Sequence, residues 1–127
     1  MNFVSAVVHI VDDDASFRTS TGRVLRASGY TVETYESAEQ LLKRLPNGAA
    51  PGCILLDIKM PSMSGPELQD RLKTRGLSLP IIFLTGQADI PTTVQVIKAG
   101  AEDLLTKPVA KDTLLQTILS PHPHNAG

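Results

Sequence analysis

The chain of 127 residues contains one cysteine, no tryptophan and only five aromatic residues. The single thiol, Cys53, excludes a disulfide framework and a cysteine-rich zinc site, and its aliphatic neighbours predict an ordinary buried side chain. An excess of one charge is also missing, because 12 Lys and Arg oppose 13 Asp and Glu and leave a formal net charge of −1. The overall field therefore favours neither nucleic acid nor an anionic membrane as a partner.

Membrane-spanning apolar runs and glycine-rich phosphate loops are absent as well. No apolar run approaches the roughly 20 residues that cross a bilayer. Residues 1–11 are apolar but carry no Lys or Arg and lead straight into Asp12, which argues against a signal peptide. Without a P-loop type of glycine cradle, the sequence gives no support to nucleotide binding. We expect a cytoplasmic protein with no membrane association.

Aliphatic residues dominate what is present: 33 are Ile, Leu or Val. They fall in short runs, each followed by a segment with helical periodicity. The predicted strands are 7–11, 31–35, 53–56, 81–84 and 104–105, and the predicted helices are 15–28, 38–45, 66–76, 91–99 and 112–119. Strands separated by helix-length segments indicate βαβ crossovers. The expected fold is a doubly wound α/β domain with a five-stranded parallel sheet and helices on both faces.

Two of the predicted helices have an apolar stripe that should face the sheet. In helix 91–99 this inward stripe consists of Val94 and Ile97. In helix 15–28, which should stop at Gly29, the inward residues are Phe17, Thr21, Val24, Leu25 and Ser28. The arginines of helix 15–28 are expected on a solvated face that a partner could contact; they are Arg18, Arg23 and Arg26.

Polar residues follow four of the five strands, at the edge where open parallel sheets bind their ligands. Only strand 31–35 ends without a chemically obvious group. The strand-end residues are Asp12, Asp13, Asp14, Asp57, Thr85, Gly86, Thr106, Lys107 and Pro108. Gathered carboxylates repel unless a cation neutralises them, and oxygen ligands without His or Cys select a hard ion such as Mg²⁺.

A hydroxyl and an ammonium at the same edge can bind a tetrahedral anion. Metal, carboxylate, hydroxyl and ammonium together supply what phosphoryl transfer requires, and a carboxylate can act as the nucleophile and form an acyl phosphate. Each residue also has a structural interpretation on its own: Asp14 as a helix N-cap, Thr85 as part of a turn, and Lys107 as a solvated charge. The combination at four strand ends favours the chemical interpretation.

The same residues resemble the receiver domain of two-component response regulators over nearly the whole chain. Within that family, the FixJ/LuxR type is most similar in Gly86-Gln87-Ala88-Asp89-Ile90-Pro91 and Lys98-Ala99-Gly100-Ala101. The matching motifs are Val11-Asp12-Asp13, Leu55-Leu56-Asp57-Ile58-Lys59-Met60-Pro61, Ser64-Gly65, Leu84-Thr85-Gly86 and Lys107-Pro108. The resemblance implies a flavodoxin-like, CheY-like (βα)5 fold with strand order 2-1-3-4-5. It also implies a regulatory phosphoacceptor rather than an enzyme.

Specific roles follow from this resemblance. Asp57 would accept a phosphoryl group from a sensor histidine kinase. Asp13, Asp57 and the backbone carbonyl of Lys59 would ligate Mg²⁺, with Asp12 holding the ion mainly through water. Thr85 and Lys107 would bind the phosphoryl oxygens. Gly86 would leave room for the group, and Pro108 would orient Lys107 through a cis peptide.

The resemblance also implies a switch. Thr85 would be drawn toward the phosphoryl group and rebias the surface formed by the fourth helix and the fifth strand. Relatives usually have an aromatic residue three positions before the lysine, whereas this chain has Leu104. The altered surface would control homodimerisation or an output domain, and DNA would be contacted only through such an output domain.

Two alternatives remain open at this point. One is a Mg²⁺-dependent phosphohydrolase of the haloacid-dehalogenase type, which would use Asp12. The other is a pseudo-receiver that acts without phosphorylation, although Asp57, Thr85 and Lys107 are intact. We expect residues 1–119 to form the receiver domain. Residues 120–127, rich in Pro and His, should be a tail or the start of a linker to an absent output domain.

Overall fold

The computed structural model describes residues 7–45, 52–58, 63, 65–76, 79–86, 94, 98, 103–107 and 109–119. The elements are β1 (Val7–Val11), α1 (Ala15–Ala27), β2 (Thr31–Tyr35), α2 (Ala38–Arg44), β3 (Gly52–Asp57), α3 (Gly65–Thr74), β4 (Ile81–Thr85), β5 (Asp103–Thr106) and α5 (Lys111–Leu119). They match the predicted elements to within two residues at each end. The predicted helix 91–99 lies largely outside the described residues.

The five strands form one parallel sheet in the order β2-β1-β3-β4-β5, as expected. Strand β1 pairs with β2 on one side and with β3 on the other, so the strand order reverses between β1 and β3. Parallel pairing brings the carboxyl ends of all five strands to the same edge. In a doubly wound sheet a ligand binds beside this reversal point, so the ends of β1 and β3 are the first place to look for a site.

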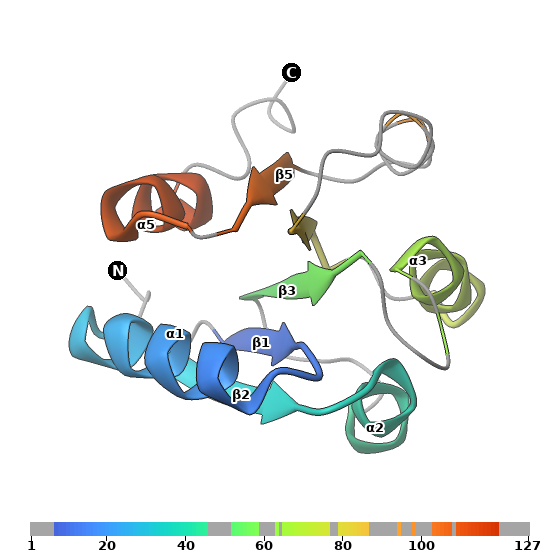
Figure 1. Cartoon of the computed structure of the whole chain (residues 1–127). Helices are drawn as coiled ribbons and strands as arrows, with labels where there is room; N and C mark the ends of the chain where they lie inside the picture. Colours follow the sequence, from blue (N-terminus) through green and yellow to red (C-terminus); the bar gives the residue numbers. More distant parts are fainter. Residues whose placement is uncertain are drawn as a thin grey trace.

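Helices cover both faces of the sheet, with α1 and α5 on one side and α2 and α3 on the other (Figure 1). Each pair buries a separate apolar cluster. The first cluster joins Leu41 of α2 and Leu68 of α3 to the sheet, and the second joins Leu25 of α1 and Leu114 of α5 to its opposite face. All five residues of β4 are buried, which explains its unbroken apolar sequence.

Two expected inward-facing side chains point to solvent instead. Ser28 follows α1 as its C-cap residue and is exposed, because the helix ends one residue earlier than its periodicity suggests. Val94 is helical as predicted, but its side chain is 44% exposed, so its place on the inward stripe was wrong. The segment contains other apolar residues, so its periodicity allows more than one choice of the face that points inward. Ile97 lies outside the described residues.

Three helix ends carry residues suited to that position. Ser37 caps α2 by accepting a hydrogen bond from the Gln40 amide. Gly29, after α1, and Gly76, after α3, both have positive φ angles, of 97° and 74°. Side chains rarely adopt this backbone conformation, so glycine is the residue that ends these helices at low cost.

A buried polar pair links β1 to β2 on the α2 side of the sheet. The Nδ1 atom of His9 lies 2.9 Å from the hydroxyl of Tyr35, and the Arg44 guanidinium stacks over the Tyr35 ring at 4.9 Å. Burial lowers the pKa of His9, although the nearby charge of Glu33 partly opposes this effect. The last residue of β2 therefore has a structural partner, which the sequence did not reveal.

The thiol of Cys53 is buried in β3, as predicted. Burial raises its pKa to about 12, so the thiol stays protonated and unreactive near neutral pH. Across the residues that the structure describes, no helix has the length and apolarity needed to cross a bilayer.

Candidate functional site

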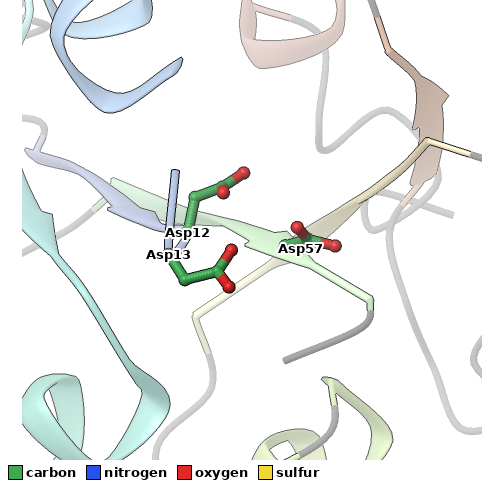
Figure 2. A group of neighbouring side chains, drawn as sticks. All are labelled: Asp12, Asp13 and Asp57. Atoms are coloured by element: carbon green, nitrogen blue, oxygen red, sulfur yellow. The ribbon is translucent and has the colours of Figure 1, made fainter. Parts of the chain in front are cut away.

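Three carboxylates meet at the point where the strand order reverses. Asp12 directly follows β1, Asp13 comes next, and Asp57 is the last residue of β3. Each offers an oxygen atom, and these oxygens lie within 4.8 Å of one another. Figure 2 shows the three side chains gathered at this edge of the sheet. The sequence predicted this grouping, and the parallel pairing of β1 with β3 produces it.

Asp12 is the buried member of the group, with a side chain that is 0% exposed. Its Oδ1 accepts a hydrogen bond of 2.9 Å from the Asp14 amide. Its Oδ2 lies 2.6 Å from Nζ of Lys107, across the sheet edge. A buried carboxylate requires such partners because removing its charge from water costs several kcal/mol.

Lys107 connects two of the carboxylates. Besides its bond to Asp12, its Nζ lies 3.3 Å from Oδ2 of Asp57, whose side chain is 14% exposed. The backbone amide of Lys107 donates to the carbonyl of Thr85 at 2.8 Å, which ties the lysine to the end of β4. Burial by itself would lower the pKa of Lys107, but the hydrogen bond to Asp12 and the charges of Asp57 and Asp12 outweigh it and raise the pKa.

Phe17, in the first turns of α1, contributes a contact that the sequence did not predict. Nζ of Lys107 lies 4.5 Å from the centre of the Phe17 ring, within the range of a cation–π interaction. From the sequence, Phe17 was expected only on the inward face of its helix, and the side chain does pack against the core that α1 shares with α5. Its position five residues after Asp12 is the signal that could have placed it beside the strand ends.

The remaining strand-end residues line the same edge. Thr85, the last residue of β4, is buried and stands opposite Thr106 in the register of β4 with β5. Gly86 is exposed, and a Cβ atom there would meet no other atom within 4 Å. Leu104 stands opposite Phe83 and packs, partly buried, against the core on the α2 and α3 face.

Three further predictions have different outcomes. Asp14 is an N-cap: its side chain accepts hydrogen bonds from the amides of Ser16 and Phe17 at 2.9 and 3.3 Å, which confirms the structural interpretation. The carbonyl of Lys59 and the peptide before Pro108 lie outside the described residues.

The donor set fits a hard divalent cation. Asp12, Asp13 and Asp57 supply only carboxylate oxygens, which suits Mg²⁺ better than softer ions that prefer nitrogen or sulfur. Asp13 is exposed, so part of the coordination sphere would open to solvent, and Mg²⁺ commonly keeps several waters. A cation here would also relieve the repulsion among three clustered carboxylates.

Fold and site together define a class: parallel α/β domains with an acidic cluster and a lysine at the carboxyl edge of the sheet. Residues 8–119 match the family model described as the response regulator receiver domain. The chain belongs to this family.

Named relatives share this assignment. The chain is 42% identical over 114 residues to the response regulator protein TodT of Pseudomonas putida, covering 90% of this chain and 50% of TodT. It is 44% identical over 119 residues to the C4-dicarboxylate transport transcriptional regulatory protein DctR of Rhodobacter capsulatus, covering 92% and 60%. The chain thus spans about half the length of the curated relatives it matches.

Solved structures agree with the fold. The crystal structure of FixJ-N is similar with a TM-score of 0.85 and 35% sequence identity, over 94% of each chain. The order 2-1-3-4-5 and the CheY-like arrangement of helices are therefore confirmed. The family assignment places the domain in two-component phosphorelay signalling.

Proposed function

We propose that Asp57 is the phosphoacceptor, which takes a phosphoryl group from the phosphohistidine of a sensor histidine kinase. One observation carries the proposal: a carboxylate at a strand end, partly open to solvent, lies next to two further carboxylates and 3.3 Å from a lysine ammonium. An acid cluster alone can bind a cation, but the added ammonium also provides for an incoming anion. Membership of the receiver family supports the same assignment.

The step is a displacement at phosphorus. An oxygen of the Asp57 carboxylate forms the new P–O bond, the P–N bond of phosphohistidine breaks, and imidazole leaves with the electron pair. Asp13, Asp57 and the carbonyl of Lys59 would ligate Mg²⁺, and Asp12 would hold the ion mainly through water. The bound ion would neutralise charge on the phosphoryl oxygens. Lys107 would neutralise further charge on the phosphoryl oxygens and would give up its bonds to the carboxylates.

Phosphorylation would then act as a switch. The phosphoryl group adds close to two negative charges at the sheet edge. Thr85 would donate its hydroxyl to a phosphoryl oxygen, with Gly86 leaving space beside it and Pro108 fixing the direction of Lys107. Movement of Thr85 would affect Leu104, since β4 and β5 are paired neighbours. A leucine offers no hydroxyl and no ring, so its change of packing would transmit the signal through volume alone.

The output is proposed to be homodimerisation or control of a DNA-binding domain that follows residues 120–127, because TodT and DctR are regulators about twice this length or somewhat less. The domain itself would be regulatory and would turn over no external substrate. A cytoplasmic location fits the proposed kinase partner. These proposals concern the whole protein and rest on its relatives.

Acetyl phosphate tests the phosphoacceptor directly. Incubation with Mg²⁺ should add one phosphoryl group to the intact mass, and the adduct should be lost under mildly alkaline conditions, as an acyl phosphate is. Asp57→Asn should abolish the adduct. Asp70→Asn is the matched control, because Asp70 is an exposed acid on α3 and its replacement changes net charge equally.

Each alternative predicts a different result. A phosphohydrolase would release phosphate continuously from phosphate esters and would lose activity in Asp12→Asn rather than form a stable adduct on Asp57. A pseudo-receiver would show no adduct in any variant. Either outcome would refute the proposed role of Asp57.

A further inference from the structure

A second polar site lies on the outer side of α1, away from the acid cluster. A groove of about 390 Å³ runs between this helix and the edge strand β2. Its lining residues are Arg18, Thr19, Arg23, Arg26 and Thr34. All five side chains end in hydrogen-bond donors, and none is a carboxylate. From the sequence, the three arginines were expected on a solvated face that a partner could contact, and the threonines had no predicted role.

Two of these arginines are each anchored by a hydrogen bond to a backbone carbonyl. Nη1 of Arg18 donates to the carbonyl of Asp12 at 2.7 Å, and Nη2 of Arg26 donates to the carbonyl of Val32 at 3.3 Å. The anchors fix the direction of the guanidinium groups while leaving most of their five N–H donors available.

Neutral carbonyls orient these arginines but do not compensate their charge. In the described part of the chain, Arg44 and Arg71 each have a glutamate carboxylate within 4.0 Å. No described carboxylate lies that close to any of the three groove arginines. Three like charges along one groove repel one another, so a ligand that brings negative charge would bind favourably.

We propose that this groove binds a small oxyanion carrying at least two negative charges, such as a compound with a pyrophosphate group. Its volume lies within the range of roughly 300 to 1,000 Å³ that is typical of small-molecule sites. Guanidinium forks match the paired oxygens of phosphate groups, and the threonine hydroxyls can donate to further oxygens. Fixed donors in a concave groove favour a compact anion over an extended acidic segment.

The groove is separate from the acid cluster but is joined to it by one hydrogen bond. Arg18 bonds the carbonyl of Asp12, which belongs to the same peptide unit as the Asp13 amide. An anion that binds the remaining donors of Arg18 should therefore change the chemical shift of the Asp13 amide. Binding itself requires no phosphorylation of Asp57, so the proposal stands independently of the proposed function.

Inorganic pyrophosphate, titrated in metal-free buffer, is the probe. Calorimetry should give saturable binding, and the Nε–H resonances of Arg18, Arg23 and Arg26 should shift in ¹⁵N-edited NMR spectra while that of Arg71 stays in place. The Asp13 amide should move together with them. Asp57→Asn should bind pyrophosphate as tightly as the wild type does, whatever the outcome of the phosphorylation assay.

Arg23→Gln and Arg71→Gln form the matched pair, because both residues are exposed and both changes remove one positive charge. Arg23→Gln should weaken binding by about tenfold, as expected for a charge-assisted hydrogen bond, with an unchanged melting temperature. Equal weakening by Arg71→Gln would show nonspecific attraction only and would overturn the proposal. Tighter binding of a hexaglutamate peptide than of pyrophosphate would also overturn it and assign the groove to an acidic protein segment.

Discussion

Replacing Phe17 by leucine removes the ring beside Lys107 while keeping an apolar side chain against the core that α1 and α5 share. The ammonium lies 4.5 Å from the ring centre, and it also bonds two carboxylates. The ring is therefore a third contact that holds the ammonium of Lys107 in place, beside the two carboxylates. We expect Phe17→Leu to leave the fold intact and to loosen this ammonium.

The magnitude follows from the exposure of the lysine. Cation–π interactions contribute about 0.5 to 1 kcal/mol at exposed sites and about 2 kcal/mol when the cation is desolvated. The Lys107 side chain is 21% exposed, so a value of about 1 to 1.5 kcal/mol applies. Because the ring stabilises only the charged ammonium, the variant should lower the pKa of Lys107. Phosphorylation by acetyl phosphate should slow by up to about tenfold if the ring holds the ammonium for the reaction.

Lysine-detected NMR measures the effect without any phosphoryl donor. The ε-methylene protons of Lys107 should show an upfield ring-current shift in the wild type and in Phe17→Tyr, which keeps a ring. In Phe17→Leu the shift should vanish and the pKa should fall. The reasoning would be refuted by an identical lysine resonance and pKa in all three proteins. If the NMR change appears without a change in rate, the ring positions the lysine but the reaction does not depend on it.

Four further perturbations test the fold and the site by thermal denaturation, with about 4 °C expected per kcal/mol for a chain of 127 residues. Asp14→Ala removes the α1 N-cap and should cost about 1 kcal/mol, and a melting temperature equal to that of the wild type would contradict the capping role. Mg²⁺ at about 100 times its Kd should stabilise the protein by about 2.7 kcal/mol, and much less in Asp13→Asn; equal shifts in both proteins would place the ion elsewhere. Tyr35→Phe leaves the buried His9 nitrogen without its partner and should cost about 1 to 3 kcal/mol. Because burial lowers the pKa of His9, the unfolded chain binds a proton first, so stability should fall as pH drops below about 6.5; a pH profile unaltered by His9→Gln would contradict this.

The fold was predictable because its signals are local. Each strand is a short aliphatic run, and α1 and α3 are each followed by a glycine with a positive φ angle, Gly29 and Gly76. The errors concern which side of a helix faces the sheet. Ser28 and Val94 were assigned to inward faces and are exposed, because periodicity alone does not fix how a helix is rotated against the sheet.

The acid cluster was predictable for a related reason. Asp12 and Asp57 end adjacent parallel strands, so any sheet with this strand order brings them together. Contacts made by long side chains were harder to foresee. The sequence predicted that Lys107 lies at the sheet edge, but it did not predict that the ammonium contacts Asp12, Asp57 and the ring of Phe17.

The sequence by itself determined the alternation of strands and helices, the carboxyl edge where chemistry gathers, and the carboxylates placed there. Tertiary structure decided which side chains meet across that edge. Lys107 bonds Asp12 over 95 positions of sequence, and His9 bonds Tyr35 over 26. Such pairs depend on the order of strands and the rotation of helices, which are set by burial of two apolar faces at once. Local pattern carries no information about those distances, so only the packed sheet could reveal the arginine groove and the ring beside the lysine.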